Sequence, residues 1–157
     1  MGKFLLWTIG WGGELDHHKR EASTKDIFEI FKFNMKILGI DQVVEPIRMD
    51  STEASKNFQD KSVDLVFIDG DHRYEKFKQD VLAWYPKVKK GGIICGHDCE
   101  GYYDDYPKRI KNIIDSSLDK DYIPKIGHPG VIKGLYEIFG RNFKIISKVG
   151  IWYHIKT

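Results

Sequence analysis

The chain has 157 residues, 41% of them hydrophobic and 13% aromatic, which is enough for one domain with a hydrophobic core and excludes a disordered or low-complexity protein. The formal net charge is only +2 and the 25 Lys and Arg are spread along the sequence, so we predict no nucleic-acid partner. Two cysteines do not make a disulfide framework, and the apolar run at the start is too short to span a bilayer. We therefore expect a cytoplasmic protein with no membrane partner.

The first part of the chain alternates between strand and helix patterns. The predicted strands are residues 3–9, 42–49 and 63–68, and the predicted helices are residues 23–40 and 51–58. Ser23 or Thr24 is the expected N-cap of the first helix, and Gly39 closes it. The run VDLVFI at 63–68 is almost continuously apolar, as is typical of a strand covered on both faces in a parallel sheet.

The second part continues with a helix over 73–90, which Pro86 distorts and the run KKGG ends. Its expected apolar stripe consists of Tyr74, Phe77, Val81, Leu82 and Trp84. A strand at 92–96 follows. The remaining predicted elements are a polar insertion with a helix near 107–118, a helix at 130–140 and an antiparallel hairpin of two strands around Gly150.

Alternating strands and helices predict an α/β fold with parallel βαβ units in a single domain over residues 1–157. In open sheets of this kind, ligands bind beyond the carboxyl ends of the strands. Three polar clusters stand at such ends: Asp50 with Ser51, Asp69 to His72, and His97 with Asp98. We expect them to share one crevice.

The run VDLVFIDGDHRYEKFKQDVLAWYPKVKKGGIICGHD at 63–98 resembles the fourth strand, following helix and fifth strand of class I S-adenosylmethionine-dependent methyltransferases. The most similar branch holds metal-dependent sugar and macrolide O-methyltransferases and cephalosporin-hydroxylase-like proteins. The segments FEIFKFNMKILGI, EPIRMDSTEAS and HPGVIKGLYEIF are similar to the same branch, so the resemblance covers roughly residues 24–157. It implies a Rossmann-like methyltransferase sheet, mostly parallel with a C-terminal antiparallel hairpin.

The resemblance also implies the activity, which is transfer of a methyl group from S-adenosylmethionine to a hydroxyl of a sugar or similar polar metabolite. It assigns Asp69 and Asp98 as ligands of Mg²⁺ or another divalent cation, with His97 as a third ligand. It assigns His72 as the general base and Asp50, Ser51 and Asp69 to cofactor binding. This chemistry is coherent, because a hard cation lowers the pKa of a hydroxyl and a histidine can then accept its proton.

One family feature is missing. The acid-x-Gly-x-x-x-Gly turn that holds the cofactor after the first strand has no counterpart, since the glycine-rich run GWGG at 10–13 is followed by a loop rather than a helix and a second strand. We expect a sheet without its usual first βα unit. The chain is then N-terminally truncated relative to the family, or the strand at 3–9 fills the vacant position, or a second copy completes the sheet in a homodimer.

Several alternatives stay open. Asp69 is equally well explained as a helix N-cap, and Asp71 is better explained as a cap or a solvated residue. A zinc site of Cys95, His97 and Cys99 is disfavoured, because three ligands so close on one strand do not easily converge on one ion. Four residues of the insertion either wall an acceptor pocket or pack the insertion onto the sheet: Tyr102, Tyr103, Tyr106 and His128.

The activity itself has two alternatives. Without the glycine-rich turn, the chain is explained as a non-catalytic methyltransferase remnant that binds a ligand or partner. The same acids can also activate a water molecule, as in a metal-dependent hydrolase.

Overall fold

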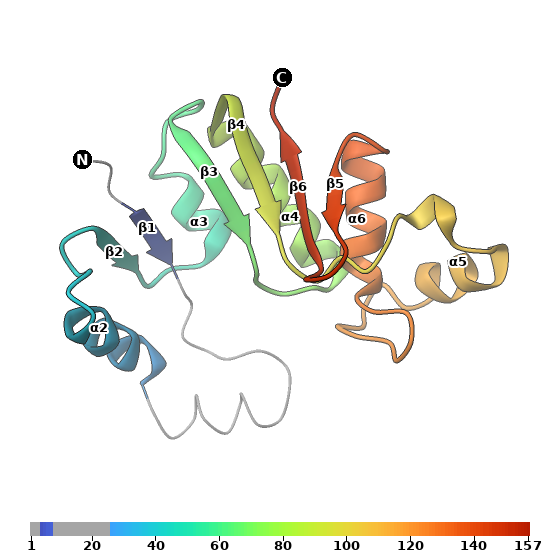
Figure 1. The fold of residues 1–157 in the computed structure, drawn as a ribbon, viewed down its shortest axis with the longest axis horizontal. Coiled ribbons are helices and arrows are strands. Elements are labelled where there is room, and N and C mark those ends of the chain that lie inside the picture. Colours follow the sequence, from blue (N-terminus) through green and yellow to red (C-terminus); the bar gives the residue numbers. More distant parts are fainter. Residues whose placement is uncertain (1–3, 8–25) are drawn as a thin grey trace. The chain divides into compact units, whose positions relative to one another are not determined.

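The computed structural model describes residues 4–7 and 26–157, which fall into two compact units divided between Asn57 and Phe58 (Figure 1). The first unit contains β1 (Phe4–Trp7), α2 (Ile27–Ile37), β2 (Val44–Ile47) and α3 (Ser51–Ser55). The second contains β3 (Val63–Ile68), α4 (Tyr74–Trp84), η1 (Tyr85–Lys87), β4 (Val88–Gly96), η2 (Tyr103–Asp105), α5 (Lys108–Asp115), α6 (Pro129–Phe139), β5 (Lys144–Ile146) and β6 (Ile151–Ile155). Each unit has its own sheet.

In the first unit, β1 and β2 pair in parallel, from Phe4 opposite Val44 to Trp7 opposite Ile47. Helix α2 begins at the N-cap Asp26, whose carboxylate accepts hydrogen bonds from the N–H groups of residues 28 and 29. The predicted caps, Ser23 and Thr24, lie outside the described residues, as does the glycine-rich run 10–13. The prediction of an earlier helix start is wrong, because the Asp26 side chain satisfies the first free N–H groups of the helix. Gly39, at φ +65°, follows the helix as expected.

The second unit has a four-stranded sheet in the order β3-β4-β6-β5. Strands β3 and β4 are parallel, whereas β6 is antiparallel to both β4 and β5. Helices α4 and α6 lie together on one face of this sheet (Figure 1). The predicted α/β class, the parallel pairing of 63–68 with 92–96 and the antiparallel hairpin around Gly150 are confirmed.

The core of the second unit lies between this sheet face and the two helices. Phe77 and Trp84 of α4 and Trp152 of β6 are fully or almost fully buried, and the Phe77 and Trp152 rings meet edge to face at 5.8 Å. Gly134 of α6 lets the helices approach, because a Cβ there would lie 2.7 Å from the Phe77 ring. This packing fixes α6 and the loop before it against the sheet.

Three predictions about the second unit are wrong. The strand at 63–68 is covered on one face only, since Val66 and Ile68 are buried while Leu65 and Phe67 are 54% and 44% exposed. Leu82, expected in the buried stripe, is 54% exposed. The helix predicted to residue 90 ends at 84, and the run KKGG belongs to β4, because Pro86 removes a helical donor and Gly91, at φ +78°, permits the bend in the strand.

None of the helices in the described part of the chain combines the length and apolar character that crossing a membrane requires.

Candidate active site

The candidate site is built from three loops of the second unit. Two of them follow β3 and β4, whose carboxyl ends lie at the same edge of the sheet because the strands are parallel. The third precedes α6 and is held by the packing of that helix. These loops bring together Asp69, His72, His97 and Asp98, as predicted. They add Glu100 and Asp121, which the sequence did not single out, and His128, which the sequence assigned either to an acceptor pocket or to packing of the insertion.

His72 stands at the centre of the cluster. Its Nε2 lies 2.9 Å from Asp98 Oδ2 and 3.9 Å from Asp69 Oδ1, and its Nδ1 lies 2.9 Å from Asp121 Oδ1. The imidazole is 19% exposed. Burial on its own would lower the pKa of His72, but the carboxylates of Asp69, Asp121 and Asp98 raise it to about 9. Although Asp98 is close, His72 Nε2 is buried without a well-directed hydrogen bond.

Asp98 lies close to all three histidines of the cluster, His72, His97 and His128. Its Oδ1 lies 2.9 Å from His97 Nδ1 and 3.8 Å from His128 Nδ1. The backbone at Asp98 is left-handed, with φ +64°, a conformation that costs a non-glycine residue about 1 kcal/mol or more and gathers at functional sites. The hairpin supports this conformation, because the N–H of Cys99 donates to the carbonyl of Gly150 at 3.0 Å.

Two overlapping sets of side chains could hold a metal ion. The donor atoms of Asp69, His97 and Asp98 all lie within 4.8 Å of one another, and so do those of His72, Asp98 and His128. The His72 imidazole lowers the pKa of the Asp69 carboxyl, so this group is ionised near neutral pH. Two carboxylates with one imidazole form a donor set that suits a divalent cation.

The helix-cap alternative for Asp69 is wrong. The N-cap of α4 is Arg73, and the carboxylate that serves this end of the helix is Asp71, whose Oδ1 accepts from Arg73 N at 3.0 Å and from Arg73 Nε at 2.9 Å. Asp71 therefore has the structural role expected of it. Asp69 is left facing His72 rather than the helix.

Asp50 and Ser51, the predicted adenine contacts, belong to the first unit. Asp50 is the N-cap of α3, and its Oδ1 accepts from Thr52 N at 3.0 Å, Thr52 Oγ1 at 2.6 Å and Glu53 N at 3.2 Å. The role of Asp50 as the N-cap of α3 was not predicted from the sequence. Of the three clusters expected to share one crevice, those at 69–72 and 97–98 lie together in the second unit.

The cysteines lie apart from the metal-binding sets. Cys95 points its thiol at the Val66 carbonyl, 3.3 Å away, and burial raises the pKa of the fully buried Cys99 to about 12. Within residues 26–157, the donor groups close enough to share an ion include no cysteine. This supports the sequence argument against a zinc site of Cys95, His97 and Cys99.

Glu100 and Asp121 needed the folded chain to be recognised, and the folded chain places His128, a candidate from the sequence, beside Asp98. Glu100 Oε1 lies 2.7 Å from His128 Nδ1, and Glu100 Oε2 accepts from His128 N at 3.0 Å. Gly127, at φ +105°, makes this possible, because a Cβ there would lie 2.0 Å from Glu100 Cδ. Asp121 stands 49 positions from its partner His72 and carries no local signal in the sequence.

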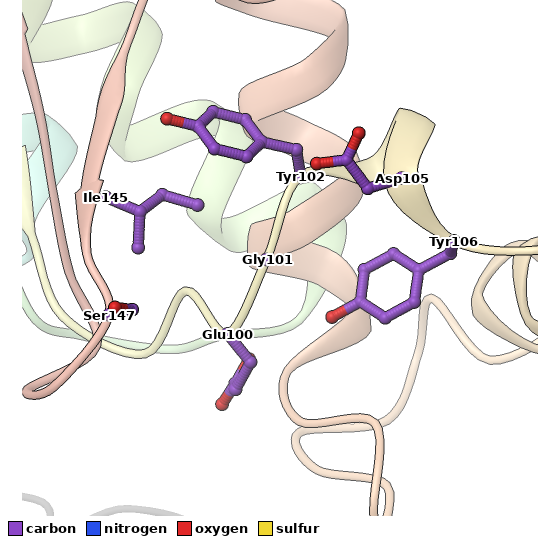
Figure 2. A pocket seen from close by; sticks show the side chains of 7 residues that line it. All are labelled: Glu100, Gly101, Tyr102, Asp105, Tyr106, Ile145 and Ser147. Atoms are coloured by element: carbon purple, nitrogen blue, oxygen red, sulfur yellow. The ribbon is translucent and has the colours of Figure 1, made fainter.

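A cavity of about 440 Å³ lies beside the site, between the loop after β4 and strand β5 (Figure 2). Its lining residues are Glu100, Gly101, Tyr102, Asp105, Tyr106, Ile145 and Ser147. Figure 2 shows the side chains of Tyr102 and Ile145 pointing toward one another across it. None of the three carboxylates around His72 lines the cavity, but Glu100 joins it to His128.

The insertion tyrosines were expected either to wall an acceptor pocket or to pack the insertion onto the sheet, and the answer differs between them. Tyr102 and Tyr106 line the cavity. Tyr103 packs instead, since its ring stacks on Tyr136 at 4.8 Å and its hydroxyl donates to Asp115 at 2.8 Å.

Comparison with known proteins agrees with this architecture. A family model described as a methyltransferase domain matches residues 7–99. A protein of Sinorhizobium fredii, described as uncharacterized protein y4gI, is 39% identical over 54 residues, which are 34% of this chain and 6% of that protein.

Solved structures with the same fold include a Staphylococcus aureus protein assigned as a caffeoyl-CoA O-methyltransferase, with a TM-score of 0.53, 17% identity and coverage of 99% of this chain and 76% of that one. They also include a Bacillus cereus O-methyltransferase in complex with SAH, with a TM-score of 0.51 and 18% identity, of which the chain covers 63%. An O-methyltransferase family protein of Burkholderia thailandensis has a TM-score of 0.53 and 12% identity. The chain covers 44% of that protein.

Proposed function

The chain belongs to the class I S-adenosylmethionine-dependent methyltransferases, through the methyltransferase domain that matches residues 7–99, and we propose that it methylates a hydroxyl of a sugar or similar polar metabolite with the help of a divalent cation. The observation that carries the proposal is the position of His72 Nε2, 2.9 Å from Asp98 and 3.9 Å from Asp69. A base therefore faces two carboxylates at the edge of the sheet where this fold binds its ligands.

Asp69, His97 and Asp98 are the proposed ligands of the cation, Mg²⁺ or another divalent ion. The set fits such an ion because its donor atoms lie within 4.8 Å of one another and the Asp69 carboxyl is ionised near neutral pH. When bound, the cation would lower the pKa of an acceptor hydroxyl and offset the carboxylates that hold the proton on His72.

His72 is the proposed general base. The Nδ1–H of His72 donates a hydrogen bond to Asp121, which directs Nε2 toward Asp69 and Asp98, where the acceptor hydroxyl is to lie. With a pKa of about 9, the imidazole of the cation-free protein is protonated at neutral pH. We therefore expect methyl transfer to need the cation twice, for the hydroxyl and for the base.

Asp50, Ser51 and Asp69 are the proposed cofactor contacts. Asp50 follows β2 at its carboxyl end, the position from which this fold reaches a bound nucleotide. Capping α3 is compatible with this role, because a carboxylate offers about four acceptor sites. The cofactor supplies the methyl group, and the protein supplies the orientation of both reactants.

The cavity bounded by Tyr102 and Tyr106 is the proposed acceptor site. Its polar groups, Glu100, Asp105 and Ser147, can accept or donate hydrogen bonds, and the two aromatic rings can pack on the apolar faces of a sugar. Glu100 connects it to His128 and hence to Asp98. The lining thus offers both polar groups for hydroxyls and apolar surface for the faces of a sugar ring.

We further propose a cytoplasmic homodimer. In residues 58–157, β3 pairs on one side only, with β4. A strand edge without a partner in its own unit can pair with a strand of another copy. Light scattering tests this, and a monomer in solution would contradict it.

The deciding experiment is calorimetric titration of the full chain with S-adenosylmethionine and S-adenosylhomocysteine, with and without Mg²⁺, followed by a screen of hydroxylated acceptors. His72→Ala should retain cation binding and lose transfer, whereas Asp60→Asn, a surface change at the Lys87 ion pair, should keep both. No cofactor binding at millimolar concentration would overturn the proposal in favour of the remnant. Cation-dependent hydrolysis without the cofactor would favour the hydrolase.

A further inference from the structure

Two imidazoles and one carboxylate converge beside the proposed Mg²⁺ ligands. His72, Asp98 and His128 come from three different loops of the second unit, and their donor atoms lie within 4.8 Å of one another. Nε2 of His72 is 2.9 Å from Asp98 Oδ2, and Nδ1 of His128 is 3.8 Å from Asp98 Oδ1. The two imidazole rings are 4.6 Å apart at their centroids.

Each histidine is held by a further carboxylate. Asp121 Oδ1 lies 2.9 Å from His72 Nδ1, which leaves His72 Nε2 as the nitrogen directed at Asp98. Glu100 Oε1 lies 2.7 Å from His128 Nδ1, and Glu100 is fixed by the backbone N–H of His128. Metal-binding histidines typically have a carboxylate on the ring nitrogen away from the ion, which sets the tautomer and the ring orientation. Asp121 has this position at His72, whereas at His128 Glu100 contacts Nδ1, so Nε2 of His128 is the nitrogen left for an ion.

A second observation points to a ligand. The Nε2 atom of His72 is inaccessible to solvent and has no well-directed hydrogen bond, although it faces Asp98. When the imidazole is neutral with its proton on Nδ1, the lone pair of Nε2 faces the Asp98 carboxylate, and a cation between the two groups would replace this repulsion with two favourable contacts.

The charges around the three residues favour a cation. Asp98, Glu100 and Asp121 contribute carboxylates, and the nearby Arg73 is already bound to Asp71. The N-terminus of α6 at His128 opposes a cation through its partial positive charge. This partial charge repels a cation less strongly than the three carboxylates attract it.

We propose that His72, His128 and Asp98 form a second cation site, which prefers a borderline metal such as Zn²⁺ or Co²⁺ to Mg²⁺. Imidazole nitrogens suit these ions, whereas Mg²⁺ prefers oxygen ligands. The second set is also more enclosed, since His72 and His128 are 19% and 13% exposed while Asp69 and His97 are 53% and 44% exposed.

The two sites share Asp98, and this has a consequence for activity. An ion at the second site engages Nε2 of His72, the atom that accepts the proton in the proposed function. Zn²⁺ should therefore inhibit methyl transfer in the presence of Mg²⁺. This consequence rests on the proposed function, but binding of the ion does not.

The test is titration of the metal-stripped full chain with Co²⁺, followed by its visible absorption, in matched variants. His128→Gln removes a ligand of the second set only, and His97→Gln removes a ligand of the first set only. We expect His128→Gln to weaken Co²⁺ binding by about tenfold or more, as loss of a supporting or direct ligand does, and His97→Gln to weaken it by less than about twofold. Equal effects of the two variants, or no effect of His128→Gln, would overturn the proposal.

A measurement on the unaltered chain guards against a variant that fails to fold. In nitrogen-15 spectra of the imidazoles, Zn²⁺ should shift the ring nitrogens of His72 and His128 and leave those of His97 nearly in place. A shift of His97 with none at His128 would contradict the second site. Co²⁺ binding at His128 in a chain that shows no methyl transfer would overturn the proposed function alone.

Discussion

His72 and Asp121 are 49 positions apart in the sequence, and their Nδ1 and Oδ1 atoms lie 2.9 Å apart in the folded chain. This contact orients the ring so that Nε2 points at Asp98. It also sets the tautomer, because a proton held on Nδ1 leaves the lone pair on Nε2 once the ring is neutral. The loop before α6 thus sets the chemical state of a residue that lies beyond β3.

Asp121→Asn should lower the pKa of His72 in the metal-free chain from about 9, because the amide keeps a hydrogen-bond acceptor and loses the charge. An NMR titration of the imidazole measures the shift. An unchanged pKa would show that Asp98 and Asp69 alone hold the proton.

The same interaction predicts a pH dependence of stability. The folded pKa of His72 lies above its usual value of 6.5, so this contribution is complete below about pH 6.5 and is lost as the pH rises toward 9. The rise of the His72 pKa corresponds to roughly 3–3.5 kcal/mol before the discount for solvent screening. Urea unfolding across this pH range gives the free energies of unfolding of the unaltered chain and of Asp121→Asn. The difference between these two free energies should become smaller as the pH rises. A constant difference would contradict the prediction.

The two cysteines should be inert in the folded chain. Burial raises the pKa of both thiols, that of Cys99 to about 12, and only the thiolate reacts. A disulfide reagent at pH 8 should label neither residue until denaturant is added, and then both. Rapid labelling of the native chain at Cys99 would contradict the burial described for it.

Gly130→Ala should destabilise the chain by about 1–3 kcal/mol. A Cβ at this position would lie 2.3 Å from both the carbonyl of His72 and the N–H of Tyr74, so α6 must move away from the loop that carries His72. Gly70→Ala is the matched control, since the nearest atom to its Cβ is Asp80 Oδ2 at 3.4 Å. Thermal unfolding compares the two, and equal melting temperatures would contradict the close approach of α6.

Tyr102→Ala should raise the KM for the acceptor by roughly tenfold, which is what the loss of one aromatic contact costs, with a smaller change in kcat. Tyr103→Phe is the control, because that ring stacks on Tyr136 outside the cavity. Steady-state kinetics on the acceptor found by the screen provides both values. If Tyr103→Phe has the larger effect on KM, the acceptor lies elsewhere.

The sequence predicted those parts of the molecule that depend on local patterns or on one topological rule. Asp69 and Asp98 could be placed near each other because each ends a strand and the strands were predicted to be parallel. Gly150 could be placed at the turn of the hairpin from a local signal, because glycine readily adopts the left-handed conformation found there.

What the sequence missed depends on contacts between distant segments. Asp121 and Glu100 sit in polar loops where carboxylates are common, so only the packing of α6 distinguishes them from solvated residues. Leu65 and Phe67 look like core residues from their composition, and whether they are covered depends on what packs against that face. Local pattern carries no such information.

The hydrogen bond from Cys99 to Gly150 also bears on the order in which the site can be assembled. Strand β6 follows β3, β4 and β5 in the chain, yet it occupies an inner position of their sheet. During synthesis the ribosome releases Asp98 about fifty residues before the turn that supports it, since domains fold as their segments emerge. Until β6 inserts, β4 has an open edge and the backbone that carries Asp98 is unsupported, so a chaperone that shields this edge should raise the yield of correctly assembled protein.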